Sequence, residues 1–266
     1  MAIFIYIAIA YISIFIHELG HYLSAFLLGI KAETVTTGMG FNLIKIKSKH
    51  TAFIFKIFPG GGMTTFREKD LEHISAIKSL IILASGVFLN YLTAGLAMSL
   101  YLKTTILQGF EQLNLITIKF LTQLVQLLNI KTMLFPEGTI TDSVQQIADN
   151  SSTTTFILFL FIFMNLILFI FNLLPIPFFD GGQIISIIFD PLLLAMGISE
   201  RILDYMKLFI NRLVGFALIS LILIPFLYQI YLKITLASNP LKEFIKWLIV
   251  LIITMLLNRL FIKHSE

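Results

Sequence analysis

Long apolar runs constrain the fold of this chain more than any other feature of its sequence. The run from Ser79 to Leu102 lies between Lys78 and Lys103 and contains no charged residue. A run of about 20 apolar residues is long enough to cross the hydrocarbon core of a bilayer as a helix. Of the 266 residues, 58% are hydrophobic and only 13% are charged, so a water-soluble domain would have too little polar surface to cover its core. The sequence therefore predicts an integral membrane protein.

We expect an all-α polytopic membrane fold of about four or five transmembrane helices, with one membrane-associated β-hairpin loop after the first helix. The first four helices are predicted at about 3–28, 79–102, 155–174 and 208–232. A fifth, at about 241–262, is a weaker prediction because Lys246 and Arg259 lie inside it, although both side chains can extend towards opposite interfaces. Residues 1–235 form the predicted core, and residues 236–266 form an additional C-terminal helix and tail.

The connections carry three smaller predictions. Residues 113–128 form an expected amphipathic helix at the membrane interface, and Asp190-Pro191 is expected to form a turn. The loop at about 33–62 has the alternation and the β-branched and aromatic residues of strands, and Pro59-Gly60-Gly61-Gly62 is expected to end its second strand. This loop is more apolar than a solvated loop. A hairpin inserted against the helices and a sheet lying on the membrane surface both explain that, and the sequence leaves both open.

The charges predict how the chain is oriented. A net charge of +4 could suggest a nucleic-acid partner, but the basic residues lie in loops beside apolar runs, which is the pattern that orients membrane proteins. We therefore expect no nucleic acid as a partner. Residues 31–78 carry eight Lys and Arg residues and residues 103–154 carry three. The positive-inside rule places the first loop in the cytoplasm and the N-terminus outside.

The pentapeptide His17-Glu18-Leu19-Gly20-His21 lies within the first apolar run and has the pattern HExxH. On a helix, His17 and His21 are one turn apart on the same face, so both imidazoles can reach one metal ion. Glu18 points about 100° away, beside the ion rather than onto it. A carboxylate inside a bilayer costs about 3 kcal/mol or more without a partner, so chance is a poor explanation for its position.

HExxH on a helix is a zinc-binding pattern of metalloproteases. A zinc protease needs a third protein ligand for its ion, and because the sequence contains no cysteine, this ligand must be His, Asp or Glu. Asp180 is the first charged residue after Asp149. Pro175 and Pro177 are expected to stop the preceding helix, and the glycines after Asp180 permit a tight turn. Broken helices within membranes often aim a polar group at a site. Asp180 is the predicted third ligand, and an ordinary turn at a helix end is the alternative.

HELGH, followed by Asn-x-x-Pro-x-Pro-x-x-Asp-Gly-Gly at 172–182, resembles the site-2 protease family of intramembrane zinc metalloproteases over most of residues 1–235. The resemblance implies one Zn²⁺ per chain, bound by His17, His21 and Asp180, with Glu18 as the catalytic base. The candidate substrate-binding residues that it implies are Asn172, Gly38 and Gly40. Further candidates near the site are Gly86, Asn90, Pro175, Pro177 and Gly181. Phe179 replaces the family's usual Leu, and no PDZ module interrupts the chain, a compact form that looks prokaryotic.

The predicted function is cleavage of the transmembrane segments of membrane-protein substrates, within a multi-pass protein of the prokaryotic cell membrane whose active site faces the cytoplasmic side. The expected partners are these substrates and the lipid bilayer; a regulatory membrane partner stays unidentified. Pairing with an edge of the 35–49 segment would hold an unwound substrate extended.

Three alternatives stay open. A transporter or metal carrier would use the His and Asp residues as an ion path. A non-catalytic relative would bind membrane proteins without cleaving them. A different metalloprotease class would take its third ligand from a glutamate, of which Glu33 is the nearest after HELGH. Glu18 directly after His17 favours the protease.

Overall fold

The computed structural model describes residues 2–71, 74–127, 152–216 and 245. The chain divides into two compact units, of which the first comprises Met1–Leu124 and Gly138–Arg212. Apart from the last residues of two helices, the elements below belong to this first unit. Most of the predicted fourth span, 208–232, and nearly all of the predicted fifth, 241–262, lie outside the described residues.

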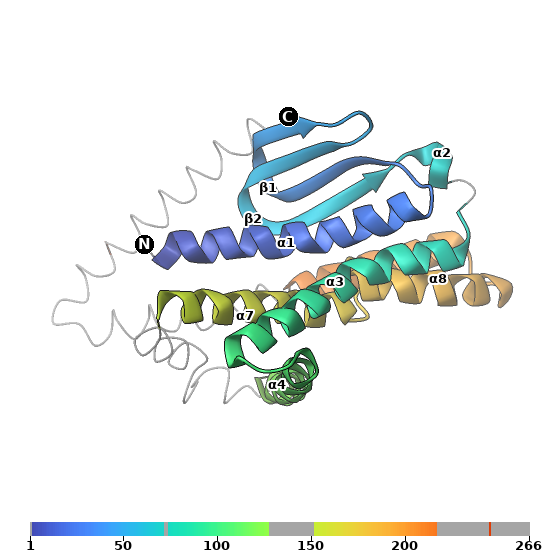
Figure 1. The fold of residues 1–266 in the computed structure, drawn as a ribbon. Coiled ribbons are helices and arrows are strands. Elements are labelled where there is room, and N and C mark those ends of the chain that lie inside the picture. Colours follow the sequence, from blue (N-terminus) through green and yellow to red (C-terminus); the bar gives the residue numbers. More distant parts are fainter. Residues whose placement is uncertain (1, 72–73, 128–151, 217–244, 246–266) are drawn as a thin grey trace. The chain divides into compact units, whose positions relative to one another are not determined.

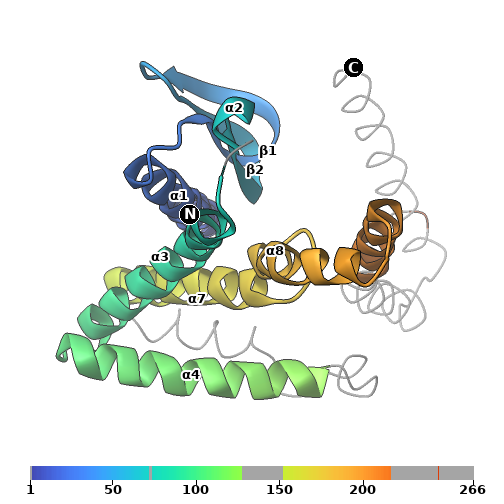
Figure 2. The same cartoon turned by 90° about the vertical axis from the view of Figure 1, so that its right-hand side faces the viewer.

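Three long helices form the centre of the first unit: α1 (Ala2–Leu27), α3 (Ala76–Leu102) and α7 (Thr153–Leu173). Each of them is long and apolar enough to cross a membrane, and in the described part of the chain there are three such helices. Their bounds agree with the predicted ones to within a few residues. They pack against one another pairwise, as Figure 1 and the turned view in Figure 2 show.

Serine side chains begin two of these helices. The Ser75 hydroxyl accepts a hydrogen bond from the backbone N–H of Lys78 at the start of α3, and Ser152 caps Thr155 in the same way at the start of α7. Such caps satisfy backbone donors that have no partner within the helix. A fourth helix, α4 (Ile106–Leu127), covers the predicted amphipathic segment. Its Leu113 is fully buried in one apolar cluster with residues of α3 and α7.

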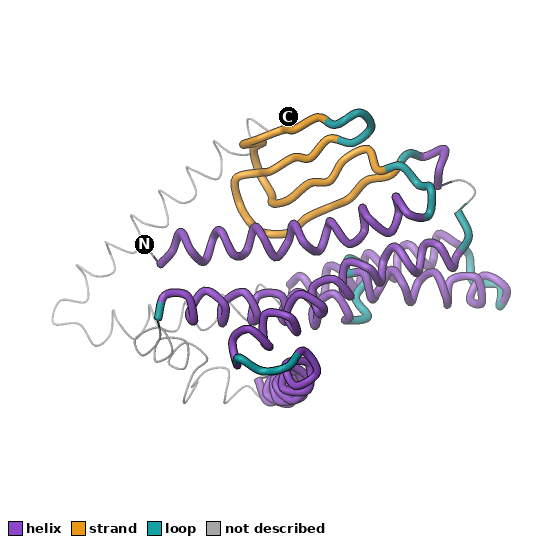
Figure 3. Tube along the Cα trace, in the orientation of Figure 1, coloured by secondary structure: helices purple, strands orange, loops and turns teal. Residues whose placement is uncertain are grey.

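The loop after α1 forms the predicted hairpin from β1 (Ala32–Lys47) and β2 (Ala52–Phe66), followed by the short helix α2 (Glu68–Leu71). Both strands are bent, so they pair as four segments, seen as the four orange runs in Figure 3. In order across the sheet, these segments are residues 42–47, 52–56, 32–37 and 62–66. The two outer pairings are antiparallel, whereas in the inner one the partner numbers rise together, from Thr34 opposite Ala52 to Thr37 opposite Phe55.

One prediction for this loop is wrong, because β2 does not end at Pro59–Gly62. The strand passes through the glycines and continues to Phe66, since the 62–66 segment pairs with the start of β1, from Thr37 opposite Gly62 to Ala32 opposite Phe66. β1 bends at Gly38 and Gly40, whose φ angles of 94° and 85° suit glycine far better than other residues. The bend makes the last segment of β2 an edge of the sheet.

The sheet lies along α1, as Figure 1 shows, and contacts it through aromatic rings. Phe15 packs against Phe53 and Phe55, with ring centroids 6.4 Å and 5.5 Å apart, and Tyr22 packs against Phe53 at 5.5 Å. Because α1 is a candidate membrane span, a sheet packed along its length lies at membrane depth. This placement favours the inserted hairpin over a sheet on the membrane surface.

After α7 the chain breaks at the two prolines and starts again as α8 (Asp180–Ala195). Gly181 and Gly182 allow α8 to begin directly against this break: a Cβ on Gly182 would lie 2.0 Å from the Ile176 carbonyl oxygen. The predicted turn at Asp190-Pro191 is wrong, because Pro191 lies inside α8. The Asp190 carboxylate forms an ion pair with Lys207 on the helix at 200–216.

Candidate active site

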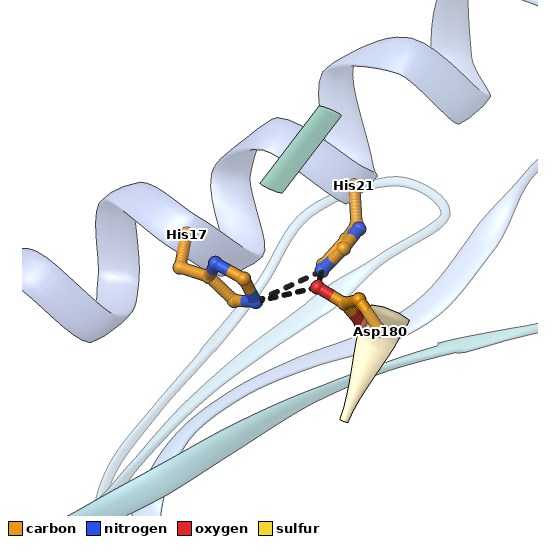
Figure 4. Close-up of side chains that lie close together, drawn as sticks. All are labelled: His17, His21 and Asp180. Carbon is orange, nitrogen blue, oxygen red and sulfur yellow. Dashed lines mark hydrogen bonds and ion pairs between the residues drawn. The ribbon is translucent and has the colours of Figure 1, made fainter. Parts of the chain in front are cut away.

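Side chains from α1 and from the start of α8, which are far apart in the sequence, converge at one point. The Nε2 atoms of His17 and His21 lie 3.2 Å apart, and Asp180 Oδ2 lies 3.1 Å from the first and 3.3 Å from the second. Figure 4 shows both imidazoles of α1 directed at the carboxylate at the start of α8. All three residues are buried, with 6–8% of their surface exposed. The structure thus brings together the three side chains predicted as metal ligands.

In both imidazoles, a hydrogen bond at Nδ1, the ring nitrogen that points away from Asp180, decides which nitrogen carries the hydrogen. His21 Nδ1 lies 2.7 Å from the Ile82 carbonyl oxygen, which can only accept, so Nδ1 carries the hydrogen. His17 Nδ1 lies 2.8 Å from Asn90 Oδ1 and is a donor in the same way. In the neutral form each ring then has a lone pair on Nε2. These are the ring nitrogens that face Asp180.

The orientation of the Asn90 amide is set by a buried network of polar side chains. The Asn165 amide group donates to the Phe161 carbonyl oxygen at 2.8 Å and to Ser13 Oγ at 3.0 Å. Its own oxygen therefore accepts from the Asn90 amide group at 2.8 Å. Asn90 also donates to the Ser13 carbonyl oxygen at 3.2 Å, which leaves its oxygen for His17. Ser13, Asn90 and Asn165 are fully buried.

The convergence leaves three electron-pair donors without a hydrogen between them. Asp180 Oδ2 is buried and has no hydrogen-bond donor among the described residues. Two lone pairs and a carboxylate oxygen at 3.1–3.3 Å repel one another unless a proton or a metal cation lies between them. Tetrahedral zinc with ligand distances of about 2.0–2.1 Å requires a ligand-to-ligand spacing of about 3.3 Å. The donor set and its spacing therefore fit one zinc ion.

Glu18 lies beside this triad and is held by the sheet. Its side chain is 4% exposed, and the Thr64 hydroxyl donates to Glu18 Oε2 at 2.7 Å. A Cβ on Gly62 would lie 2.5 Å from Glu18 Oε1, so this glycine gives the carboxylate its space. Gly62 and Thr64 both belong to the edge segment of β2. The sheet thus positions the carboxylate that the sequence predicts as a base.

A cavity of about 650 Å³ opens onto the three converging side chains and Glu18. Asn172, a predicted substrate-binding residue, lines it and donates from its amide to the Leu168 carbonyl oxygen at 3.0 Å. Gly38 and Gly40 form the bend of β1, while Met39 between them lines the cavity. The sheet contributes a continuous wall at residues 60–66.

The remaining predicted residues support the site from behind. Gly86 lies against both imidazoles: a Cβ there would be 2.5 Å from His21 Nε2 and 3.0 Å from His17 Cε1. Pro175 and Pro177 lie in the break before α8. A Cβ on Gly181 would lie 2.5 Å from the Leu173 carbonyl oxygen, so this glycine allows close contact with that break.

Sequence reasoning missed three residues of the site: Ser13, Thr64 and Asn165. Asn165 interrupts an apolar helix, and an amide at that depth is a signal that could have been weighed, because a buried polar group needs a partner. Ser13 lies one helical turn before His17, on the same face. Thr64 gives no comparable signal, since threonine is common in strands.

Comparisons with known proteins agree with this geometry. The model of peptidase family M50 matches residues 5–222. Relatives in Fusobacterium nucleatum, Clostridium perfringens and Campylobacter jejuni carry names that provisionally assign them as zinc metalloproteases. Each is 33% identical, over 89, 99 and 94 residues respectively. These matches cover 30%, 32% and 30% of this chain and 26%, 30% and 26% of the relatives, so the chain aligns with only about a quarter to a third of their length. The family match extends over most of the sequence, and the protein belongs to peptidase family M50.

Proposed function

We propose that this protein is a zinc-dependent endopeptidase that cleaves the transmembrane segments of other membrane proteins. The observation that carries the proposal is the convergence of His17, His21 and Asp180 at 3.1–3.3 Å, beside a buried Glu18 and within helices that can cross a membrane. The three converging residues hold one zinc ion, and Glu18 is the catalytic base. Zinc bound there supplies Lewis acidity and lowers the pKa of a water molecule to about 7.

The residues of the chain divide the hydrolysis between them. Glu18 takes a proton from the attacking water and delivers it to the leaving amide nitrogen, so that one water is consumed for each peptide bond. Thr64 keeps the carboxylate in place through its hydrogen bond. Asn90 and the Ile82 carbonyl orient the imidazoles and hold their hydrogens on Nδ1.

The substrate pairs with the edge of the sheet. A transmembrane helix hides its carbonyl groups in its own hydrogen bonds, so it must unwind before cleavage. The 62–66 segment of β2 pairs with β1 on one side only within the described sheet, and it lines the cavity. Strand addition at this edge holds an extended peptide beside Glu18. Asn172 then contacts substrate directly, and Gly38 and Gly40 act by shaping the bend around Met39.

The same reasoning places the protein. We place it as a multi-pass protein in a prokaryotic cell membrane. The excess of Lys and Arg in the loop after α1 supports an orientation with the N-terminus outside and the active site towards the cytoplasm. Its partners are membrane-embedded substrates. A transporter that used the His and Asp residues as an ion path is the weaker alternative, because it gives no role to Glu18.

Removing the metal should abolish cleavage and adding it back should restore it. Full-length protein, purified in detergent and stripped of its zinc by a chelator, is expected to lose all measurable cleavage of a single-span test substrate. The three converging residues are electron-pair donors, so none of them can take over the role of the cation. Stoichiometric Zn²⁺ should restore the rate, whereas Mg²⁺ should not, since Mg²⁺ requires an octahedral set of oxygen ligands. Elemental analysis should find one zinc per chain. Cleavage that persists in the stripped protein would refute the metal's role.

A smaller effect is expected from Gly62→Ala. The new methyl group would displace the Glu18 carboxylate, which is the flexible end of a side chain, so the fold should be retained. A catalytic group displaced by about 1 Å costs about 10²-fold in rate. Gly60→Ala is the matched control, because its methyl group would meet only the Met39 side chain, with the sulfur at 3.1 Å. Cleavage rates at equal zinc content compare the two, and equal losses would contradict a specific role for Gly62.

A further inference from the structure

We propose that this protein binds the phosphate headgroup of an anionic membrane lipid in a second cavity, at the end of α1. This headgroup cavity has a volume of about 270 Å³ and lies between the last turns of α1 and the turn at 48–51 that joins β1 to β2. It shares no lining residue with the cavity of the active site. The proposal depends on residence in a membrane and not on proteolysis. The lining residues that matter for binding are Tyr22, Phe26, Lys31, Lys49, His50 and Thr51.

The charge of the cavity selects an anion. Lys31 and Lys49 supply two ammonium groups and His50 supplies a third nitrogen donor, while no acidic residue belongs to the lining. Neither ammonium forms an ion pair within the described part of the chain. The Asp70 carboxylate, which does not line the cavity, accepts a hydrogen bond from the backbone N–H of Lys31 at 3.0 Å. Lysine ammonium groups bind phosphate as point charges, and lysines near a membrane surface are attracted to anionic lipids.

The opposite wall of the cavity is apolar and belongs to the candidate membrane span. Tyr22 and Phe26 stack one turn apart on α1, with ring centroids 6.5 Å apart. Phe26 is 67% exposed and Leu27 is 82% exposed, although both lie within the span Phe4–Leu27. Exposed apolar side chains in that position face acyl chains, and aromatic rings are enriched at the level of the headgroups.

The order of these two walls along the chain matches the order of groups in a phospholipid. The span ends at Leu27, and Lys31 is the first charged residue beyond it. The turn at 48–51 brings Lys49 back to the same level. A phosphate bound by the lysines therefore has its acyl chains directed along Tyr22 and Phe26. A free phosphate ion would use the lysines alone and leave the aromatic wall without a role, so the structure favours the lipid.

The cavity is suited to a headgroup rather than to a larger ligand. Pockets for drug-sized molecules have volumes of about 300–1,000 Å³ and bury most of their ligand. The headgroup cavity lies just below that range and is open on one side. Thr51, which is buried, also lines the cavity and donates from its hydroxyl to the Ala32 carbonyl oxygen at 2.8 Å. A volume of this size can hold the polar end of a lipid while the acyl chains stay outside.

Lipid retention tests the proposal on the full-length protein. The protein is reconstituted in nanodiscs of phosphatidylcholine, with or without phosphatidylglycerol, and the lipids that remain bound after mild extraction are counted by native mass spectrometry. We expect phosphatidylglycerol to be retained by the wild type and its retention to fall about tenfold in Lys31→Gln/Lys49→Gln. The control Lys69→Gln/Lys78→Gln removes two exposed lysines that do not line the cavity, one on α2 and one in the first turn of α3. Because neither lysine lines the cavity and solvent-exposed charges are screened by salt, we expect this control to lower retention by about twofold at most.

A charge-conserving variant and a phosphate arm complete the test. Lys31→Arg/Lys49→Arg should retain phosphatidylglycerol, which separates lost charge from lost folding. In phosphatidylcholine nanodiscs, inorganic phosphate at millimolar concentration should not raise the unfolding temperature, whereas phosphatidylglycerol should raise that of the wild type and not that of Lys31→Gln/Lys49→Gln. Equal retention by the cavity and control variants would overturn the proposal. So would a phosphate effect equal to that of the lipid, because the site would then bind free phosphate.

Discussion

Replacing Glu18 with glutamine should abolish proteolysis while leaving the metal site intact. Glutamine has the shape of glutamate, and its side-chain oxygen can still accept the hydrogen bond from Thr64, which now has a length of 2.7 Å. It cannot take up a proton from water. Loss of a general base costs about 10²–10⁴-fold in rate. Glu18 contributes no atom to the group of three converging ligands, so the zinc content should stay at one per chain.

The measurement pairs cleavage of a single-span substrate with zinc analysis of the same preparation. Glu33→Gln is the matched control: it makes the same chemical change on β1, where the side chain is exposed. This control also tests the alternative in which a glutamate near HELGH is the third ligand, because that alternative predicts loss of zinc from Glu33→Gln. An unchanged rate in Glu18→Gln would refute the catalytic role. Loss of zinc in Glu18→Gln would instead make Glu18 a ligand.

The parts of the fold that depend on local sequence could be predicted. The bounds of α1, α3 and α7 follow from apolar runs whose length matches the bilayer. Serines cap the starts of α3 and α7, and Pro175 and Pro177 follow the end of α7. His17, Glu18 and His21 could be predicted because their spacing alone places them on one turn of a helix. Predicting Asp180 required more than local spacing, since its place beside the imidazoles depends on how α7 and α8 pack. The motif supplied that information through its prolines and glycines.

The parts that depend on tertiary contacts could not be predicted. β2 continues through three glycines because the start of β1 offers it a partner, and no local propensity records that pairing. α8 continues through Pro191, next to a contact between Asp190 and a lysine on another helix. Asn165 orients Asn90 across a helix interface, so its role is visible only once the two amides are seen 2.8 Å apart.

The second large effect is expected from Gly86→Ala, which should remove the zinc without unfolding the protein. The new methyl group would lie 2.5 Å from both Cε1 and Nε2 of His21 and 3.0 Å from Cε1 of His17. The His21 ring cannot turn away without losing its hydrogen bond to the Ile82 carbonyl, and the His17 ring is held in the same way by Asn90. Both rings must shift, so Nε2 of each leaves the position that the ion requires.

We expect zinc affinity to fall at least as far as for loss of a residue that orients a ligand, which is about 10–100-fold, and cleavage to fall with it at limiting zinc. The zinc-free form should lose little stability, because the methyl group meets side chains rather than backbone and because alanine favours a helix over glycine by up to about 1 kcal/mol, which offsets part of the cost of shifting the rings. Zinc titration and thermal unfolding in chelator measure the two effects separately.

Gly20→Ala distinguishes displacement of the rings from separation of the helices. Gly20 lies at the same crossing of α1 and α3, but its methyl group would meet backbone, with the Ser85 carbonyl oxygen at 2.5 Å and the Gly86 Cα at 2.8 Å. Backbone cannot yield as a side chain does, so Gly20→Ala should lower the stability of the zinc-free protein, by about 1–3 kcal/mol for an overpacked contact. Gly86→Ala should lower it by less, because its methyl group meets the rings of His17 and His21 and not backbone. If Gly86→Ala bound zinc as tightly as the wild type, the imidazoles would not be held where the structure places them, and the close approach of α3 to the metal site would have no functional role.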